Sequence, residues 1–273
     1  MNYLLRAPQA AIHAQPQLPA SKSISNRVLI LHALSDSPYP VENLSDSDDT
    51  RVMEAVLNSN ASDFDIRAAG TAMRFLTAYL SKIVGAWTLT GTERMQNRPI
   101  KLLVDALNSL GARIEYIKKE GYPPLRIFGS ALQGGEISLS GGVSSQYISA
   151  LLMVAPTMQR GLTLHPEGRL VSAPYVNLTI QLMRQFGAEV GWEGQTIRVP
   201  PGAYRPVPFT VESDWSAASY WYAMAALSPQ AEICLQGLFK DSLQGDAAGA
   251  GLFTRLGVET EFTAEGVRLR HTG

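Results

Sequence analysis

The sequence has little cysteine, little charge and no long apolar run, and each shortage excludes a class of protein. Cys234 is the only cysteine, so an internal disulfide and a cysteine-based zinc cluster are both excluded, as suits a reducing cytoplasm. Charged residues make up 17% of the 273 residues, below the roughly 25% of an average soluble domain, and hydrophobic residues make up 45%. We therefore expect a large interior, or a face that awaits a partner.

Net charge and hydropathy restrict the partners. A formal net charge of -1 gives no general attraction to nucleic acid or to anionic lipid, so any anion site must be local. No segment has the apolar length to span a bilayer, and residues 1–19 lack the basic start of a signal peptide and are interrupted by prolines. The sequence predicts a cytoplasmic protein with no nucleic-acid or membrane partner.

A phrase that reads as helix, glycine and strand occurs three times, at residues 106–114, 182–190 and 252–260. The glycines of this phrase are spaced by 76 and 70 residues, too far apart for a thin solenoid but suitable for a compact supersecondary unit. The alternating strands that keep step with it are at residues 87–91, 162–165 and 233–237, with a weaker early copy at 41–44. The sequence therefore predicts an α/β fold built from internally repeated units.

Four apolar helices are expected to begin at small or polar residues: Ser23, Gly70-Thr71, Ser144-Ser145 and Ser216-Ala217. Their bodies are apolar nearly all round, which is typical of helices buried in a core. If the units are related by a pseudo-rotation, the helix starts point toward a common end, where their positive termini would attract an anion. Small residues at helix starts can equally serve tight packing, and that alternative stays open.

The chain is organised around the first of these helix starts, LPASKSISNR at residues 18–27. The free backbone N–H groups of the helix would be joined there by the cations Lys22 and Arg27 and by serine hydroxyls, which together make a site for phosphate or carboxylate. The same residues also suit an ordinary serine-rich helix cap whose Lys22 and Arg27 face water.

Five motifs carry a family resemblance: LPASKSISNR (18–27), AAGTAMR (68–74), RMQNRPI (94–100), GGVSSQYISALLM (141–153) and LVSAPY (170–175). They occur in the order and approximate spacing of 5-enolpyruvylshikimate-3-phosphate (EPSP) synthase, and the chain resembles this family over essentially its whole length. The resemblance implies transfer of the enolpyruvyl group of phosphoenolpyruvate to the 5-hydroxyl of shikimate 3-phosphate, with release of phosphate, on the route to chorismate and the aromatic amino acids. It implies no metal or organic cofactor.

The resemblance also implies the site residues. Both substrates carry a carboxylate and a phosphate, which suits the arginine, lysine and serine side chains at the matching positions. The residues implied for shikimate 3-phosphate are Lys22, Ser23, Arg27, Ser144, Ser145, Gln146, Ser172 and Tyr175. Those implied for phosphoenolpyruvate are Lys22, Gly70, Arg98 and Gln146, with Lys22 as the catalytic residue. Three departures from the family pattern leave sensitivity to glyphosate open: Ala20, Ala68 and Phe75.

The family fold has two similar lobes, each of three βαβαββ-type units in an inverse α/β barrel-like arrangement. By resemblance, residues 15–211 form one complete substrate-binding lobe, and residues 1–14 and 214–273 form part of a second. Family members are longer, and their second lobe supplies an aspartate and a glutamate for proton transfer that have no counterpart in this sequence. We therefore expect a truncated chain that binds its substrates but does not turn them over.

An incomplete lobe would leave apolar side chains without neighbours. We expect Trp215, Trp221, Tyr222 and Leu238 to be exposed or to pair with another copy. The chain would then self-associate through residues 214–273, whereas the full-length enzyme is expected to be a monomer. The aspartates of this region are expected to be loop or cap residues rather than proton-transfer groups: Asp214, Asp241 and Asp246.

Two other functions stay open. A non-catalytic module could keep the shikimate 3-phosphate pocket and lack the closing lobe. UDP-N-acetylglucosamine enolpyruvyl transferase shares the fold and the enolpyruvyl donor, but it has an asparagine after its first lysine and a loop cysteine. This chain has Ser23 at the first of those positions and no cysteine before Cys234.

Overall fold

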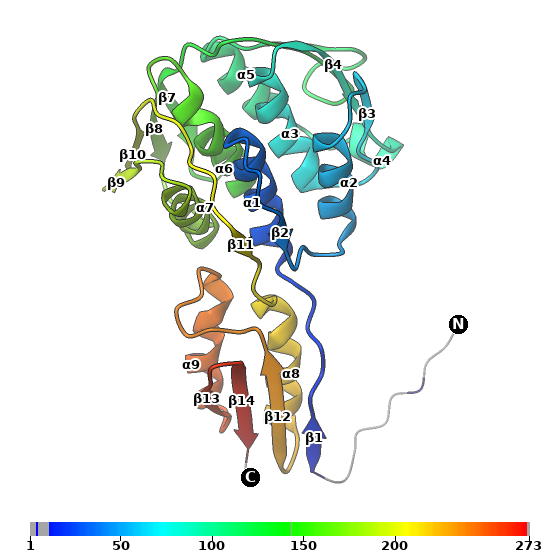
Figure 1. The fold of residues 1–273 in the computed structure, drawn as a ribbon, viewed down its shortest axis with the longest axis vertical. Coiled ribbons are helices and arrows are strands. Elements are labelled where there is room, and N and C mark those ends of the chain that lie inside the picture. The colour runs from blue at the N-terminus through cyan, green and yellow to red at the C-terminus, as the bar shows by residue number, and fades with distance from the viewer. Residues whose placement is uncertain (1–3, 5–10, 143, 272–273) are drawn as a thin grey trace. The chain divides into compact units, whose positions relative to one another are not determined.

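Figure 1 shows the computed structural model, which describes residue 4, residues 11–142 and residues 144–271. The chain is α/β, as the sequence predicts, and it divides into two compact units. The large unit comprises residues 22–210, and the small unit comprises the described residues up to 21 together with those from 211 onward. Within the described ranges, no helix is both long and apolar enough to cross a membrane.

Three main helices of the large unit begin at a small or polar residue named in the sequence analysis, or one residue before it. α1 (Lys22–Leu34), α3 (Gly70–Lys82) and α6 (Ser145–Val154) are buried over most of their length, because they pack on one another and on α7 (Ala173–Gln185). The predicted burial of these three helix bodies is confirmed. The shorter elements are α2 (Asp48–Leu57), α4 (Glu93–Gln96), α5 (Lys101–Ser109) and a 3-10 turn at Ala155–Thr157.

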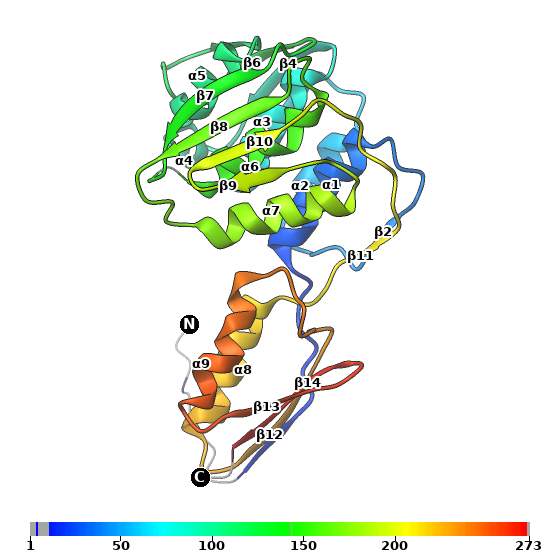
Figure 2. The same cartoon turned by 90° about the vertical axis from the view of Figure 1, so that its left-hand side faces the viewer.

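Two four-stranded sheets of the large unit share one pattern. In the first, β3 (Asp63–Asp65) is parallel to β4 (Gly85–Thr90), and β6 (Leu125–Gly129) lies antiparallel between β4 and β5 (Arg113–Tyr116). In the second, β7 (Gly135–Ser140) is parallel to β8 (Leu162–Glu167), and β10 (Thr196–Val199) lies antiparallel between β8 and β9 (Gly191–Glu193). In Figure 2 this second sheet faces the viewer, with helices of the large unit behind it. β2 (Val41–Glu42) and β11 (Phe209–Thr210) form a short parallel pair.

The small unit has the same pattern of strands. β1 (Ile12–Ala14) is parallel to β12 (Ala231–Gln236), and β14 (Gly266–His271) lies antiparallel between β12 and β13 (Glu259–Phe262). Its helices are α8 (Trp215–Leu227), α9 (Gly249–Thr254) and a 3-10 turn at Gly245–Ala248. Each of the three sheets thus belongs to a run of strand, helix, strand, helix and two strands, with the large unit inserted after β1. This is the βαβαββ order that the resemblance implies.

The three repeated glycines lie where the sequence places them. Gly111, Gly187 and Gly257 follow α5, α7 and α9 with φ angles of 98°, 86° and 81°. Residues that carry a Cβ rarely adopt these φ angles, so glycine ends each helix and lets the chain turn toward the next strand.

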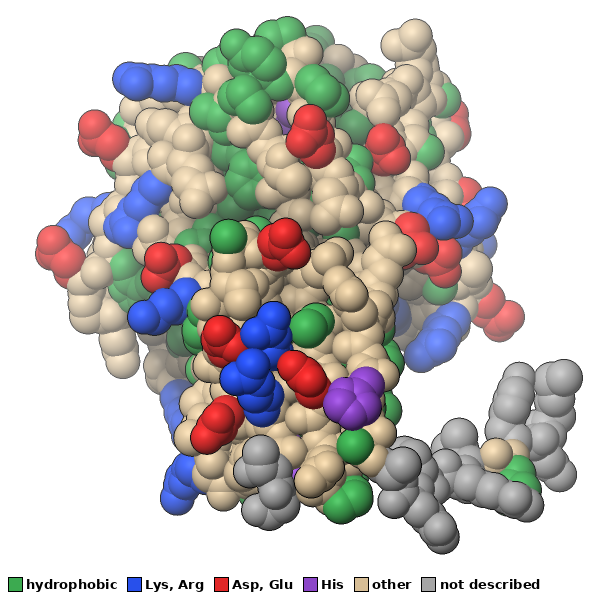
Figure 3. Space-filling model, turned by 60° about the horizontal axis from the view of Figure 1, so that its bottom comes forward, with side chains coloured by type: hydrophobic (Ala, Val, Ile, Leu, Met, Phe, Trp, Pro, Cys, Tyr) green, Lys and Arg blue, Asp and Glu red, His purple; other side chains and the backbone are tan. Residues whose placement is uncertain are grey.

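One face of the sheet in the small unit is charged. Arg268 Nη1 lies 3.2 Å from Glu261 Oε2, and Arg270 Nη2 lies 3.7 Å from the same oxygen. His13 Nδ1 lies 3.8 Å from Glu232 Oε2. Figure 3 shows basic side chains surrounded by acidic ones and a histidine. This face is therefore a solvated surface, which is usual for a mostly antiparallel sheet that packs only its other face.

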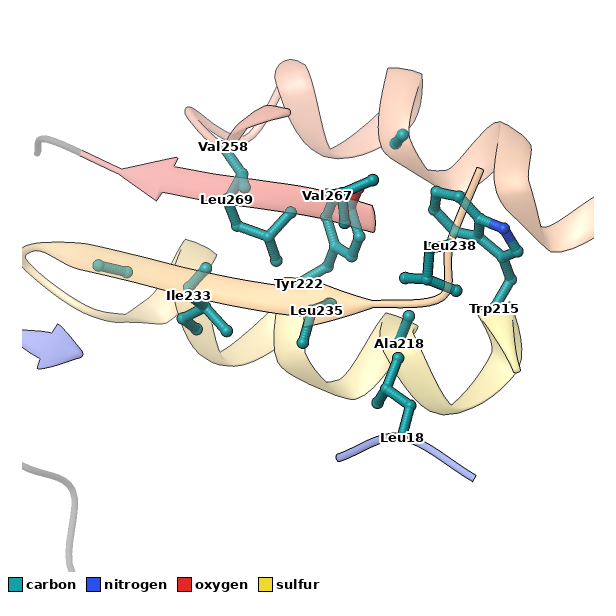
Figure 4. Close-up of a cluster of buried hydrophobic side chains, with 13 residues drawn as sticks. Leu18, Trp215, Ala218, Tyr222, Ile233, Leu235, Leu238, Val258, Val267 and Leu269 are labelled. Carbon is teal, nitrogen blue, oxygen red and sulfur yellow. The ribbon is translucent and has the colours of Figure 1, made fainter. Parts of the chain in front are cut away.

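The opposite face of this sheet packs on α8 and α9 (Figure 4). Trp215, Tyr222 and Leu238 expose only 2%, 1% and 0% of their surface there, and Trp221 is half-buried. The expectation that the first three are exposed is wrong, because the strands and helices of the small unit suffice to enclose them.

The expectation that α8 is buried all round is also wrong. The helix buries Trp215, Ala218, Tyr222 and Ala225. On its other side Tyr220, Met224 and Leu227 expose 72%, 39% and 87% of their surface. These positions follow the i, i+4, i+7 spacing of one helix face, so α8 carries an exposed apolar stripe.

Glu212 makes the stability of the small unit depend on pH. Its Oε1 accepts hydrogen bonds from Ser242 Oγ at 2.5 Å and Gln244 Nε2 at 2.9 Å, yet burial, the larger effect, raises the pKa of the carboxyl above 4.5. Because the folded protein holds this proton more tightly than the unfolded chain does, its stabilising contribution is full below pH 4.5. It is lost as the pH rises through the folded-state pKa.

Glu212→Gln is therefore expected to raise the free energy of unfolding at pH 7 by less than about 1 kcal/mol, since solvent screens a part-buried group. Urea unfolding of both proteins at pH 4 and pH 7 measures this. The advantage of the variant should shrink at pH 4, and an advantage equal at both pH values would contradict the assignment.

Candidate active site

Arg27 is bonded to three helices of the large unit. Its Nε donates to Thr179 Oγ1 at 2.7 Å on α7, and its Nη2 donates to Ser149 Oγ at 3.1 Å on α6. Nη1 donates to the carbonyl of Ser23 at 2.8 Å, and Nη2 also donates to that of Tyr175 at 3.4 Å. One buried guanidinium therefore joins α1, α6 and α7.

None of these four hydrogen bonds pairs the charge of Arg27 with an acidic side chain. All four acceptors are neutral oxygens, and the guanidinium also lies 5.4 Å from the ring centre of Phe75. Burial lowers the pKa of Arg27 to about 10, so it remains charged at neutral pH. Since a guanidinium has five N–H donors and four bonds are formed with the protein, Arg27 acts mainly as a charged support beneath the helix starts.

The start of α3 brings Gly70 and Arg98 together. A Cβ built on Gly70 would lie 2.9 Å from Arg98 Cζ, so the guanidinium rests directly against the glycine backbone. Arg98 is exposed, and Gly70 is buried. The absence of a side chain at residue 70 is therefore what allows a cation to sit at this helix start.

Asp49 also lies at the start of α3, which the sequence did not predict. Its Oδ1 accepts hydrogen bonds from the backbone N–H groups of Thr71 at 2.7 Å and Ala72 at 3.4 Å. The positive end of α3 is thus partly neutralised by a carboxylate of the chain itself, and the cation Arg98 is the stronger anion-attracting group there.

Gln146 connects the starts of α6 and α3. Its Nε2 donates to Thr71 Oγ1 at 3.1 Å, and its backbone N–H donates to Ser144 Oγ at 3.3 Å, which caps α6. Ser145 is buried as the first residue of α6. The motif residues of 141–153 therefore adjoin those of 68–74, although the two are far apart in sequence.

The remaining candidate residues lie at the starts of α1 and α7. Lys22 is exposed and Ser23 half-buried at the beginning of α1. Ser172 precedes α7 without capping it through its side chain, and Tyr175 is 40% exposed in the first turn. Through Arg27, the backbones of Ser23 and Tyr175 are bound to one side chain.

Two partners of Arg27, Ser149 and Thr179, were missed by the sequence reasoning. Each lies four residues after a predicted site residue, since Ser149 follows Ser145 and Thr179 follows Tyr175. Residues four apart share one face of a helix, so this spacing could have identified them.

Asp214 of the small unit is a helix cap, as expected. Its Oδ1 accepts from the backbone N–H groups of Ser216 at 2.7 Å and Ala217 at 3.3 Å at the start of α8, and Asp246 accepts from Ser216 Oγ. In the part of the chain that the structure describes, no three His, Cys, Asp or Glu side chains are grouped so that they could hold a metal ion.

Comparison with known proteins decides the family. The model of the family EPSP synthase (3-phosphoshikimate 1-carboxyvinyltransferase) matches residues 58–272. The chain belongs to the EPSP synthase family. The motif resemblance is thereby confirmed.

The relatives described below are longer than this chain. A 3-phosphoshikimate 1-carboxyvinyltransferase of Bacteroides fragilis is 61% identical over an alignment of 274 positions, which covers 100% of this chain and 67% of the relative. One of Vibrio atlanticus is 39% identical, over 96% of this chain and 68% of the relative. A solved EPSP synthase from Acinetobacter baumannii has a TM-score of 0.82 at 19% identity, covers 98% of this chain and is itself covered to 67%, and it shows the common fold. The chain thus spans about two thirds of EPSP synthase.

Proposed function

We propose that this chain forms the shikimate 3-phosphate side of an EPSP synthase site, the enzyme that moves the enolpyruvyl group of phosphoenolpyruvate to the 5-hydroxyl of shikimate 3-phosphate and releases phosphate. Residues 15–211 would be its complete lobe, and residues 1–14 and 214–273 part of the other; of these, residues 1–3, 5–10, 143 and 272–273 lie outside the described residues. Membership of the family supports the reaction. We also propose a cytoplasmic location, where the half-buried free thiol of Cys234 would stay reduced.

The observation that supports the site most directly is the junction of α3 and α6. Gln146 reaches Thr71, and Arg98 rests against Gly70 beside it. The residues expected to bind phosphoenolpyruvate thus adjoin the start of α6, which carries two serines expected to bind shikimate 3-phosphate. Two anions that repel each other in water would be held in contact by Arg98, Gln146 and the mobile ammonium of Lys22.

Shikimate 3-phosphate is expected to bind this 273-residue chain, and its affinity should fall as salt rises, because a phosphate monoester carries about −1.5 to −2 charges at pH 7. Ser145→Ala should weaken binding by about tenfold or more, since it removes a donor to that phosphate. Titration calorimetry at two salt concentrations measures both effects.

Ser109→Ala is the matched control for this experiment. Ser109 ends α5 in the same unit, and its hydroxyl donates locally to the carbonyl of Ala106 at 2.7 Å. Equal affinities for the parent and Ser145→Ala would refute the assignment of Ser145. The absence of any binding to the parent would refute the proposed function.

The alternatives differ in what they expect of turnover. We propose that this 273-residue chain binds its substrates without releasing phosphate from phosphoenolpyruvate. A phosphate-release assay on this chain alone therefore does not separate part of an enzyme from a non-catalytic module. The same assay on the product of the whole reading frame does. The 61% identity to a 3-phosphoshikimate 1-carboxyvinyltransferase favours the synthase over UDP-N-acetylglucosamine enolpyruvyl transferase.

Self-association is proposed to use the outer side of α8 rather than the residues first expected. Trp215, Tyr222 and Leu238 are enclosed, whereas Tyr220, Met224 and Leu227 form the exposed stripe. Light scattering should show a mass that rises with concentration toward a dimer, and Leu227→Glu should shift the protein to the monomer. Val84→Glu, at an 85% exposed valine of the large unit, is the control and should change nothing. A parent that stays monomeric at all concentrations would overturn this proposal.

A further inference from the structure

The carbonyl of Pro99 is held by two helices. Tyr147 Oη on α6 donates to Pro99 O at 2.6 Å, and Arg74 Nη2 on α3 donates to the same oxygen at 3.4 Å. Both donor side chains are buried, with 7% of Tyr147 and 5% of Arg74 exposed. Pro99 directly follows Arg98, so these bonds act on the backbone that carries the exposed guanidinium.

Arg74 also reaches the partner of Arg98. Its Nη1 donates to the carbonyl of Gly70 at 2.9 Å. A single fork therefore bridges Gly70, against which the Arg98 guanidinium lies, and Pro99, which follows Arg98 in the chain. Because a guanidinium is planar and rigid, this bridge fixes the distance between the start of α3 and the segment of Arg98.

Burying the charged guanidinium of Arg74 costs free energy, and close packing does not by itself account for its place there. Burial, and to a lesser extent the neighbouring charge of Arg98, lower the pKa of Arg74. Its Nε is buried without a hydrogen-bond partner in the described part of the chain. The Tyr147 hydroxyl gives the Pro99 carbonyl a second donor beside Arg74.

We infer that Tyr147 and Arg74 are positioning residues that clamp the Pro99 carbonyl and so hold Arg98 against Gly70, ready for an anionic substrate. This inference rests on the proposed function in that it takes Arg98 to meet phosphoenolpyruvate. It goes beyond that function because neither clamp residue is expected to touch a substrate.

Tyr147→Phe tests the clamp, since it removes only the hydroxyl. We expect phosphoenolpyruvate to bind about two- to tenfold more weakly in the presence of saturating shikimate 3-phosphate, as for one lost hydrogen bond, with the affinity for shikimate 3-phosphate within twofold of the parent. Calorimetry measures both. The amide order parameters of Asn97 and Arg98 from ¹⁵N relaxation, measured without ligand, should fall in the variant.

Tyr204→Phe is the matched control. Tyr204 is also buried, and its Oη donates at 2.7 Å to the carbonyl of Met153, which lies at the opposite end of α6 from Tyr147. It should change neither the affinity for phosphoenolpyruvate nor the order of Arg98. Arg74→Lys, which keeps the charge but cannot bridge two carbonyls, should weaken phosphoenolpyruvate binding, and its effect should not add to that of Tyr147→Phe.

Two results would overturn the clamp. One is an unchanged affinity for phosphoenolpyruvate together with unchanged order at Arg98 in Tyr147→Phe. The other is an equal loss of affinity for both substrates, which would indicate general loosening of α6. If the parent binds neither substrate, the proposed function fails, while the order parameters still decide whether Tyr147 holds the Arg98 segment.

Discussion

Arg27→Ala is expected to lower the free energy of unfolding of the large unit by about 3–5 kcal/mol and to abolish shikimate 3-phosphate binding. The side chain is 3% exposed, so its removal leaves a cavity among α1, α6 and α7. It also deprives Ser149, Thr179 and the carbonyls of Ser23 and Tyr175 of a charged donor. Urea unfolding and titration calorimetry measure the two effects.

Two further variants separate the role of Arg27 in holding the helices together from its role in binding shikimate 3-phosphate. Arg27→Lys keeps a charge but cannot reach acceptors on three helices. It should therefore lose most of the unfolding free energy that Arg27 contributes, while it retains part of the electrostatic attraction for shikimate 3-phosphate. Arg51→Ala is the control, because Arg51 is exposed and its nearest acid, Asp46, lies 3.9 Å away. It should change stability by no more than about 0.5 kcal/mol. An Arg27→Ala protein as stable as Arg51→Ala would show that the guanidinium does not hold the helices together.

The helices and their order could be predicted because the relevant signals are local. Each main helix of the large unit joins a small or polar start to an apolar body, and Gly111, Gly187 and Gly257 mark helix ends through a backbone angle that other residues avoid. The same local signal misled for α8. Its sequence is apolar on every side, but whether its second side is covered depends on what packs there, which no local pattern encodes.

The sequence names the residues of the candidate site but not their contacts. The motifs propose Gly70, Arg98 and Gln146, and the structure adds that Arg98 lies against Gly70 and that Gln146 donates to Thr71. The bond from Asp49 to Thr71 spans 22 residues and joins two helices, so spacing within either helix gave no sign of it. The burial of Arg27 was likewise not expected, because a cation beside serines suits a solvated cap as well as a buried hub.

Of these variants, Gly70→Ala should distinguish most clearly between the binding of phosphoenolpyruvate and that of shikimate 3-phosphate. The added Cβ would lie 2.9 Å from both Cζ and Nη2 of Arg98, closer than such atoms approach, so the guanidinium has to leave the start of α3. Since the obstructed group is the end of a flexible side chain and not backbone, stability should change by less than about 1 kcal/mol. The loss of a charged, forked contact should weaken phosphoenolpyruvate binding by roughly 10- to 100-fold, with shikimate 3-phosphate binding retained.

Gly249→Ala controls for the change from glycine to alanine at a helix start. Gly249 is the first residue of α9, and a Cβ there would meet nothing within 4 Å. Arg98→Ala should weaken phosphoenolpyruvate binding as much as Gly70→Ala does. The double variant should bind phosphoenolpyruvate no more weakly than either single variant, because both changes remove the same contact. If the two losses added instead, Gly70 would affect the ligand independently of Arg98, through its own backbone. The start of α3 would then bind the anion despite the carboxylate of Asp49 that caps it.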